Sequence, residues 1–340
     1  MKIALINDLH FGIKNDSPIM LEYQREFYSN IFLPYLKEND IFHVDILGDI
    51  FDKRKVINNQ TLYSAKEMLF DILALENIET RILVGNHCSF YKNTLSINSP
   101  QLLLGHYDNI TIIDSPIEYS NTLYLPWITD SNYEESMNMI ENSDMEYVFG
   151  HLELFGFDMN VGHKMDKGMN PDIFKKYKKV ISGHYHTRST DSNIHYLGAQ
   201  YELSWIDFED IKGFHTFEVE TGNLEFIENP NKLFYKLTYN EDLENIIPNI
   251  TNKIVKVIVQ NKTSQKKFDK YFEQLSSQNP FELKIIENHC EYDSVSNDVD
   301  LTIDSTETII SKYIDSCELS VEKEKLKMIF KQLHNEAILV

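Results

Sequence analysis

The chain has 340 residues, with 32 Lys and Arg against 53 Asp and Glu, which gives a formal net charge of −21. Its 42% hydrophobic and 25% charged residues are typical of a globular protein, and its length suffices for one large α/β domain and a small one. No apolar run reaches the roughly 18–20 residues of a membrane span, so we expect no membrane association. The strand-like N-terminus and three scattered cysteines predict a protein of the reducing cytoplasm without structural zinc.

In chain order, five apolar runs rich in β-branched residues each end in a polar side chain that can bind a metal ion. They span 2–8, 43–49, 80–86, 146–151 and 180–186. Segments of helical period at 20–37, 61–75 and 133–141 separate them, which predicts alternating strands and helices. Because ligands collect at the carboxyl ends of strands in open α/β sheets, these side chains are expected to converge.

The polar groups at these strand ends are carboxylates, imidazoles and one amide. They are Asp8 and His10, Asp49, Asn86 and His87, His151, and His184 and His186. Each alone has an ordinary structural interpretation as a helix cap, a turn residue or a core histidine. Together they predict a dinuclear metal centre, and the glycine before Asp49, Asn86, His151 and His184 lets the backbone pack closely there. The remaining histidines lack such a context: His43, His106, His163, His195, His215, His289 and His334.

The second half of the chain changes character. After residue 179 the pattern is mostly strands, at 179–186, 194–200, 213–221 and 224–229, and we expect them to form a second sheet packed on the first. A turn-rich boundary at 228–232 leads to a compact β-α-β unit with strands at 253–260 and 281–288 and a helix at 264–277. An acidic stretch at 291–304 is a predicted linker. Two short amphipathic helices within 305–340 fit docking on a partner or on the chain itself. The predicted domains are therefore 1–228, 229–290 and a tail of 305–340.

The motifs DLH, GDIFDKRK, GNH, GHLELFG and SGHYH resemble those of calcineurin-like metallophosphoesterases, in the version found in SbcD-type and double-strand-break repair nucleases. The resemblance is strong through YLGAQYELSW and weaker beyond about residue 229. It implies an α/β fold: a two-sheet sandwich flanked by helices, a small α/β cap domain and a C-terminal helical tail. It also implies that Asp8, His10, Asp49 and His186 hold one divalent ion, that Asp49 bridges to a second held by Asn86, His151 and His184, and that His87 is the general acid.

Two positions depart from the common family pattern. Cys88 stands where an acid often orients the histidine, so we expect the thiol to modulate His87. Asp52 replaces a second histidine of cellular members, as it does in phage members, and we keep it as a catalytic candidate. Lys53, Arg54 and Lys55 follow the second motif and Arg188 follows the last, which makes them candidate DNA contacts; further lysines there are Lys164, Lys167, Lys175, Lys176, Lys178 and Lys179. For 175–179 a solvated helix face is expected.

The resemblance implies a DNA nuclease subunit with 3′-to-5′ exonuclease and single-strand endonuclease activity in phage recombination and repair. Its cofactors would be two divalent ions, Mn²⁺ first and Mg²⁺ second. Its partners would be DNA, a second copy of the chain, and an SMC-like ABC ATPase bound through the tail. A phosphatase or cyclic-nucleotide phosphodiesterase could use the same centre, although it needs no cap, linker or tail. A non-catalytic DNA-end clamp is a third possibility, which the complete ligand set disfavours.

Overall fold

The computed structural model describes residues 1–160, 162–287, 323, 325 and 327. Met1–Ile286 form one compact unit and Glu287–Val340 the other. In the second unit, Lys323, Lys325 and Lys327 are helical; the predicted linker and the remainder of the predicted tail lie outside the described residues. Within the described part, no helix has both the length and the apolar composition needed to cross a bilayer.

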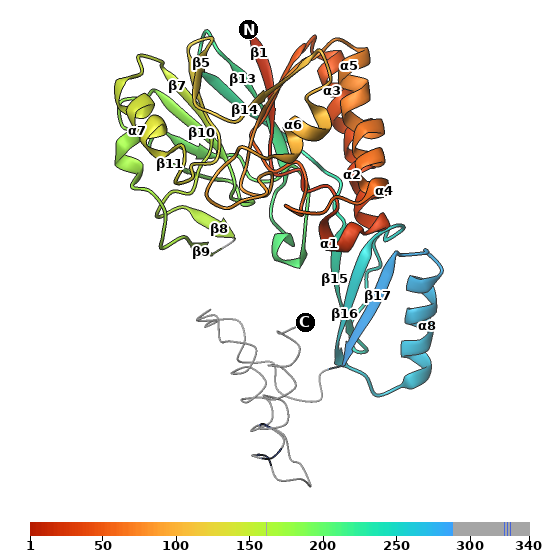
Figure 1. Ribbon diagram of the computed structural model, residues 1–340. Helices are drawn as coiled ribbons and strands as arrows, with labels where there is room; N and C mark the ends of the chain where they lie inside the picture. The colour runs from red at the N-terminus through yellow and green to blue at the C-terminus, as the bar shows by residue number, and fades with distance from the viewer. Residues whose placement is uncertain (161, 288–322, 324, 326, 328–340) are drawn as a thin grey trace. The chain divides into compact units, whose positions relative to one another are not determined.

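The first sheet has six strands in the order β14-β13-β1-β2-β3-β4 (Figure 1). Its parallel strands are β1 (Lys2–Ile6), β2 (His43–Ile46), β3 (Glu79–Leu83) and β4 (Ile110–Ile113), and its antiparallel edge is β13 (Gly213–Glu218) and β14 (Asn223–Glu228). The first three strands are those predicted from the apolar runs. Their residues are almost entirely buried, as expected for parallel strands covered on both faces.

The second sheet also has six strands, in the order β11-β12-β10-β7-β6-β5. They are β5 (Ile117–Tyr119), β6 (Thr122–Leu125), β7 (Tyr147–His151), β10 (Lys179–Gly183), β11 (Ser189–Asp191) and β12 (Ile194–Tyr196). The expected membership of this sheet was wrong, because β13 and β14 join the first sheet while β5 to β7 belong to the second. The reason lies in the interface: Ile3 pairs with Phe217, and both belong to an apolar cluster with Phe149 and Ile181 of the second sheet.

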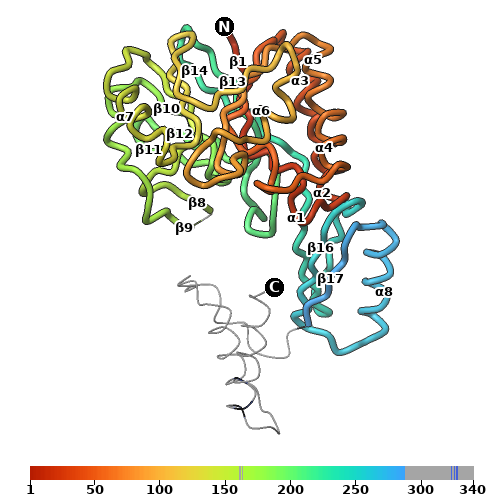
Figure 2. Tube along the Cα trace, in the orientation of Figure 1, coloured from red at the N-terminus to blue at the C-terminus, as the bar shows by residue number. Residues whose placement is uncertain are grey.

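Two long helical segments cover the other face of the first sheet (Figures 1 and 2). One comprises α1 (Ile13–Asp16), α2 (Pro18–Phe27), a π-helical turn (Tyr28–Phe32) and α3 (Leu33–Glu38); the other comprises α4 (Asn59–Ala65), a π-helical turn (Lys66–Phe70) and α5 (Asp71–Leu75). Phe27, Phe32 and Phe70 pack in one cluster with Ala4 and Val44 of the sheet. The predicted helices at 20–37 and 61–75 are thus confirmed, and each contains a π turn.

The remaining elements of this part of the chain connect the strands of the two six-stranded sheets. They are α6 (Ser99–Leu104), α7 (Tyr133–Asn142), the hairpin of β8 (Asp158–Asn160) and β9 (His163–Lys164), and 3₁₀ turns at Pro171–Phe174 and Trp205–Asp207. The helix predicted at 133–141 is α7. The lysine run at 175–179 is not a helix face: it follows the first 3₁₀ turn and leads directly into β10.

The predicted β-α-β unit is present as β16 (Ile254–Asn261), α8 (Gln265–Ser276) and β17 (Glu282–Glu287). An additional strand, β15 (Phe234–Asn240), pairs with β16 in parallel and was not predicted. Figure 1 shows α8 against one face of this three-stranded sheet. Tyr239, Val257 and Phe268 form its small core, and the Ser264 side chain caps the helix by accepting from the Lys267 N–H.

Candidate metal centre

The seven predicted metal ligands follow or end five strands of the two sheets. Asp8 and His10 follow β1, Asp49 follows β2, Asn86 follows β3, His151 ends β7, and His184 and His186 follow β10. The two sheets bring these strand ends together, so that ligand atoms from different strands lie within a few ångströms of one another. The expected convergence at the carboxyl ends of the strands is therefore what the fold produces.

A first group consists of Asp8, His10 and His186, each of which offers one ligand atom within 4.8 Å of the others. The Nε2 atoms of His10 and His186 are 3.2 Å apart. Oδ2 of Asp49 lies 4.0 Å from His10 Nε2, which places a carboxylate from a neighbouring strand end beside this group. The group can hold one divalent ion with oxygen and nitrogen ligands.

A second group, formed by Asp49, Asn86, His151 and His184, adjoins the first. Oδ2 of Asp49 is 3.3 Å from His151 Nε2, and the amide Oδ1 of Asn86 is 2.8 Å from that same nitrogen and 3.0 Å from His184 Nδ1. One carboxylate oxygen thus faces both groups. That arrangement is the one in which a carboxylate can bridge two ions.

The polar atoms of this centre fit a cation better than they fit each other. Asp8 Oδ1 is buried without a hydrogen-bond partner among the described residues. Burial lowers the pKa of His184 to about 3, and together with His186 it lowers the pKa of His10 well below its ordinary value. Both rings therefore present lone pairs at neutral pH, as metal ligands must.

His151 is the exception among these histidines. Burial alone would lower its pKa, but the Asp49 carboxylate outweighs that effect and raises the pKa to about 9. Since its Nδ1–H donates to the Leu47 carbonyl at 2.7 Å, the second proton sits on Nε2, between the oxygens of Asp49 and Asn86. The oxygens of Asp49 and Asn86 thus stabilise positive charge at this place, which suits a metal ion.

Four of the predicted ligands have left-handed backbone conformations. Their φ angles are 51° at Asp8, 44° at His10, 51° at Asp49 and 88° at His184. Such conformations cost on the order of 1–3 kcal/mol each and persist when the surroundings impose them. Here the loops hold one another, because Asp8 N–H donates to Gly48 O, His10 N–H to Asp49 O and His184 N–H to Asp8 Oδ2.

Two glycines are required by the closeness of these loops. Gly48 has φ of 101°, and a Cβ built on it would overlap the His151 ring. A Cβ on Gly85 would overlap the Asp49 carboxylate. The predicted role of these glycines, close backbone approach at the centre, is confirmed.

His87 and Asp52 lie beside the first group. The His87 backbone N–H donates to Asp49 Oδ1 at 2.8 Å, and its Nδ1–H donates to the Asp52 carbonyl at 2.6 Å. The carboxylate of Asp52 faces His10 instead, with Oδ1 3.6 Å from Nδ1. Asp52 therefore orients His87 through its main chain, and its side chain serves a different neighbour.

Comparison with known proteins agrees with this geometry. Residues 1–188 match the Metallophos family of calcineurin-like phosphoesterases. The chain belongs to this family. One relative in it, "Exonuclease subunit 1" of Enterobacteria phage T4, is 32% identical over 346 residues, covering 99% of each chain.

Two solved structures are also similar. A novel archaeal phosphodiesterase is 12% identical with a TM-score of 0.33, covering 67% of this chain and 100% of its own. A hypothetical protein from Thermus thermophilus is 14% identical with a TM-score of 0.36, covering 68% of this chain and 100% of its own.

The Cys88 side chain, which stands where the phosphoesterase pattern often has an acid, packs in the core. Its side chain is fully buried in the apolar cluster under the first sheet, and Sγ lies 4.0 Å from Asp49 Oδ1. Burial, with a further contribution from Asp49, raises the pKa of the thiol to about 12. The His87 ring is oriented by the Asp52 carbonyl, whereas the Cys88 thiol packs in the core within reach of Asp49 Oδ1. The expected influence of Cys88 on His87 stays a prediction.

The candidate DNA contacts have neighbours within the chain. Lys53 pairs with Asp16 at 2.9 Å, the Lys55 ammonium lies 5.4 Å from the Phe90 ring, and the Arg188 guanidinium lies 3.8 Å from the Phe226 ring. Nη1 of Arg54 is buried without a hydrogen-bond partner in the described part of the chain. In the lysine run, Lys175 pairs with Asp172, Lys178 pairs with Glu146, and Lys176 donates to the carbonyls of Glu141 and Ser143.

Three residues of the site were not predicted. Asn7 Nδ2 donates to Asp8 Oδ2 at 2.6 Å, and Lys212 Nζ donates to the His186 carbonyl at 2.7 Å, so both position ligands. The Trp127 ring centre lies 5.0 Å from that of His184 and 5.9 Å from that of His151. The position of Trp127 just after β6 was a usable signal, because this strand neighbours β7 in the second sheet.

Proposed function

We propose that the chain is a metal-dependent DNA nuclease subunit of a recombination and repair complex, with 3′-to-5′ exonuclease and single-strand endonuclease activity. The observation that carries the proposal is the 32% identity to "Exonuclease subunit 1" over nearly the full length of both chains. The close approach of the predicted ligands at the strand ends supports it. We further propose Mn²⁺ as the preferred ion, with Mg²⁺ as the alternative, since mixed oxygen and imidazole ligands suit manganese.

In the proposed mechanism, Asp8, His10, Asp49 and His186 would hold one ion, and Asp49, Asn86, His151 and His184 would hold a second. When bound, such ions stabilise the charge of a phosphodiester undergoing in-line attack and make water a better nucleophile. The chain contributes rigid placement, because the left-handed strand ends and their mutual hydrogen bonds determine where each ligand atom lies.

His87 is the proposed general acid. Because its Nδ1–H is held by the Asp52 carbonyl, Nε2 is the atom that can hold a proton and release it to a departing oxygen. Its backbone N–H, donated to Asp49 Oδ1, keeps the residue beside the carboxylate shared by the two groups. Asp52 acts as a positioning residue for His87 in this scheme.

DNA binding has support from a row of lysines that the sequence motifs do not reveal. Lys236 of β15 and Lys256 of β16 are direct cross-strand partners. Lys284 of β17 and Lys14 of α1 are close enough to Lys256 that, with burial, they lower its pKa. Within the chain, the Lys256 ammonium lies 3.9 Å from the Trp205 ring centre and Glu282 partly offsets the repulsion. The exposed Lys236 and Lys284 add positive charge on the same sheet, which suits a polyanionic ligand.

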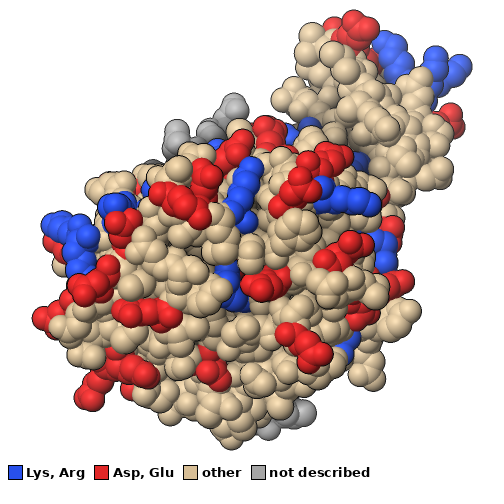
Figure 3. Space-filling view, turned by 90° about the horizontal axis from the view of Figure 1, so that it is seen from above, with Lys and Arg blue, Asp and Glu red and all other residues tan. Residues whose placement is uncertain are grey.

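The rest of the protein is acidic, which limits how much DNA it can bind alone. Figure 3 shows a face on which Asp and Glu are spread widely and Lys and Arg are interspersed among them. With a net charge of −21, strong autonomous binding to DNA is not expected. We therefore propose that a partner supplies much of the affinity, and that this partner is an SMC-like ABC ATPase bound through residues 305–340. We also propose a homodimer acting in the cytoplasm, which would be the host's if a phage encodes the chain.

A single nuclease assay tests the proposal. End-labelled double-stranded and single-stranded DNA are incubated with the protein and Mn²⁺, with and without the ATPase, beside p-nitrophenyl phosphate and a cyclic nucleotide. We expect metal-dependent shortening from 3′ ends, stimulated by the ATPase. Hydrolysis of the small substrates without DNA cleavage would favour a phosphatase or cyclic-nucleotide phosphodiesterase, and DNA binding without cleavage of anything would favour a clamp.

The tail is tested by deleting residues 305–340. We expect Mn²⁺-dependent cleavage of short single strands to remain and stimulation by the ATPase to disappear, because the described metal centre lies wholly within 1–286. Full stimulation of the truncated protein would contradict the proposed role of the tail.

A further inference from the structure

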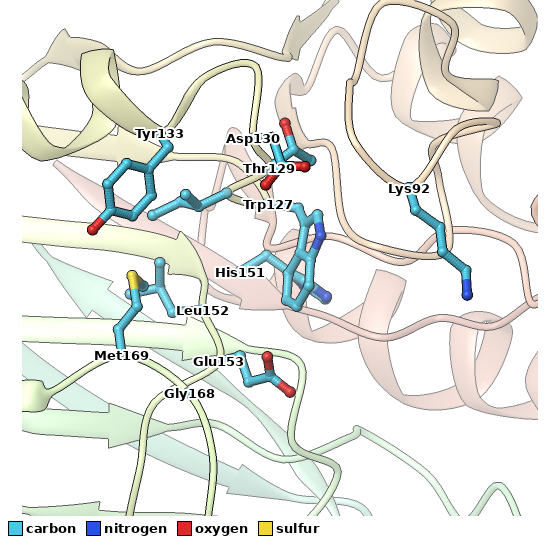
Figure 4. A pocket seen from close by; sticks show the side chains of 11 residues that line it. Lys92, Trp127, Thr129, Asp130, Tyr133, His151, Leu152, Glu153, Gly168 and Met169 are labelled. Atoms are coloured by element: carbon cyan, nitrogen blue, oxygen red, sulfur yellow. The ribbon is translucent and has the colours of Figure 1, made fainter.

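A cavity of about 540 Å³ opens directly beside the metal centre (Figure 4). Its lining includes Lys92, Trp127, Asp130, Tyr133, His151 and Glu153. Its volume falls within the roughly 300–1,000 Å³ of sites that bind small molecules. Apart from His151, its lining residues are not predicted metal ligands, and neither the family membership nor the motifs assign the cavity a ligand of its own.

The cavity shares a wall with the second group of ligands. His151 lines it and also faces Asp49 and Asn86. Trp127 lines it while its ring contacts the rings of His151 and His184. A phosphodiester held at the metal centre would therefore place one of its neighbouring nucleosides at the mouth of this cavity.

The chemistry of the walls distinguishes a base from a phosphate. Two carboxylates, those of Asp130 and Glu153, line the cavity with two cationic groups, the Lys92 ammonium and the protonated His151 ring, so the walls carry no excess positive charge that would attract a phosphate group. Trp127 and Tyr133 offer aromatic surface, and half of Tyr133 is exposed to solvent at 52%. Flat rings that carry amino groups satisfy both features by stacking and by donating hydrogen bonds to carboxylates.

The walls on the tryptophan side are held in place before any ligand binds. The Trp127 backbone N–H donates to the Val84 carbonyl at 2.8 Å, which ties the loop after β6 to the end of β3. The Asn132 side chain donates to the Trp127 carbonyl and accepts from the Thr129 N–H at 2.7 Å. This preorganisation favours binding, because little further ordering is required when a ligand enters.

We propose that this cavity is a nucleobase subsite, which receives the base of a nucleotide adjacent to the scissile phosphate. Trp127 and Tyr133 provide its stacking surfaces, and Asp130 and Glu153 accept hydrogen bonds from exocyclic amino groups. Adenine, cytosine and guanine carry such groups and thymine does not, so the site selects against thymine. This proposal rests on the proposed function as a DNA nuclease.

The test uses single-stranded oligonucleotides in which one nucleotide next to the cleaved bond is varied, first on the 5′ side and then on the 3′ side. That nucleotide carries adenine, thymine or a tetrahydrofuran abasic analogue. For the wild-type protein we expect kcat/KM to fall roughly 10-fold or more when the base is removed on one of the two sides, because the stacking interaction is removed with it. A smaller decrease, about 5-fold, is expected for thymine against adenine, corresponding to one hydrogen bond.

Variants assign the effect to the cavity. In Tyr133→Ala, the ratio of kcat/KM between base-containing and abasic substrates should fall severalfold towards one. The change should come chiefly from a higher KM for the base-containing substrate. In Asp130→Asn combined with Glu153→Gln, the preference for adenine over thymine should shrink. Tyr63→Ala is the matched control, since Tyr63 is 63% exposed on α4 and does not line the cavity; it should keep the wild-type ratios. Melting curves check that each variant folds.

Several outcomes overturn the proposal. If the wild-type protein cleaves DNA equally well with and without the base on both sides, the cavity is not a base subsite, although the nuclease function stands. If Tyr133→Ala retains the full wild-type ratio, the discrimination arises elsewhere. If the wild-type protein hydrolyses bis(p-nitrophenyl) phosphate but no DNA, the proposed function itself fails and the subsite fails with it.

Discussion

The metal centre and the small sheet of β15 to β17 differ in backbone strain and in the sign of the charge that they gather. At the metal centre, four of the predicted ligands have φ above zero, and Asp8 keeps a buried carboxylate oxygen without a hydrogen-bond partner among the described residues. The small sheet is regular, with one register shift at Tyr239/Asn240 and an apolar core beneath α8. Its unfavourable feature is the row of Lys236, Lys256 and Lys284, which lies at the protein surface.

The difference shows where each region gains by binding. In the centre, buried carboxylates and imidazoles crowd together, and a small cation relieves both the repulsion and the unmet coordination. In the small sheet, lysines on neighbouring strands are relieved by an extended anion. Backbone strain is thus concentrated at the metal centre, where a small cation is expected to bind. Charge repulsion without backbone strain is found on the small sheet, where DNA is expected to bind.

The largest effect should come from removing a metal ligand. We predict that His184→Ala lowers nuclease activity at least about 1,000-fold, since loss of even an outer-shell partner costs about 10–100-fold. The fold should survive because the ring is partly exposed at a strand end. The measurement is kcat on single-stranded DNA with limiting Mn²⁺, beside a melting curve. His106→Ala, an exposed histidine outside the centre, is the control, and wild-type turnover by His184→Ala would refute the second ion site.

The next effect is on stability. We predict that Cys88→Asp lowers the free energy of unfolding by on the order of 3 kcal/mol, because it buries a carboxylate about where Sγ now lies 4.0 Å from Asp49 Oδ1. Cys88→Ala should cost much less. Urea unfolding of both variants measures the difference. If Cys88→Asp kept wild-type stability and raised activity, the residue would contact His87 after all.

Metal binding should stabilise the first region and leave the second unaffected. We predict that saturating Mn²⁺ raises the melting temperature of the wild-type protein, with a gain of about 2.7 kcal/mol at 100 times Kd. The gain should be retained in Lys256→Gln and reduced in Asp49→Asn, in which the carboxylate facing both groups is absent. Scanning calorimetry with Mn²⁺ and with a chelator provides the test; equal gains in Asp49→Asn and wild type would contradict a centre built on Asp49.

The smallest effect concerns the small sheet. We predict that Lys236→Gln with Lys256→Gln weakens binding to single-stranded DNA severalfold and lowers the slope of log K against log salt by about 0.7 for each phosphate that the variant no longer neutralises. Stability should rise slightly, because two opposed charges are removed. Fluorescence anisotropy in the His184→Ala background avoids cleavage during the measurement. Lys175→Gln, whose lysine pairs with Asp172, serves as the control, and an equally large weakening in that variant would indicate a nonspecific charge effect.

The sequence by itself determined the chemistry of the centre and the strands that carry it. Every predicted ligand lies at or just after a strand end. An apolar run that forms a buried strand, and the polar residue that follows it, can both be recognised within a short segment of sequence. The helices at 20–37 and 61–75 and the unit of β16, α8 and β17 were predictable for the same reason. Local pattern specifies that a segment is a buried strand or an amphipathic helix, whichever partner it meets.

Only the tertiary structure decided which segments meet. Whether β13 joins the first or the second sheet depends on the pairing of Ile3 with Phe217, which no local pattern encodes. Cys88 turns into the core although its neighbour His87 lies at the centre, because the packing beneath the first sheet decides the direction of a side chain in a turn. The cavity at Trp127 and the lysine row likewise arise from residues far apart in the chain, and charge, burial and proximity between such residues exist only once the chain has folded.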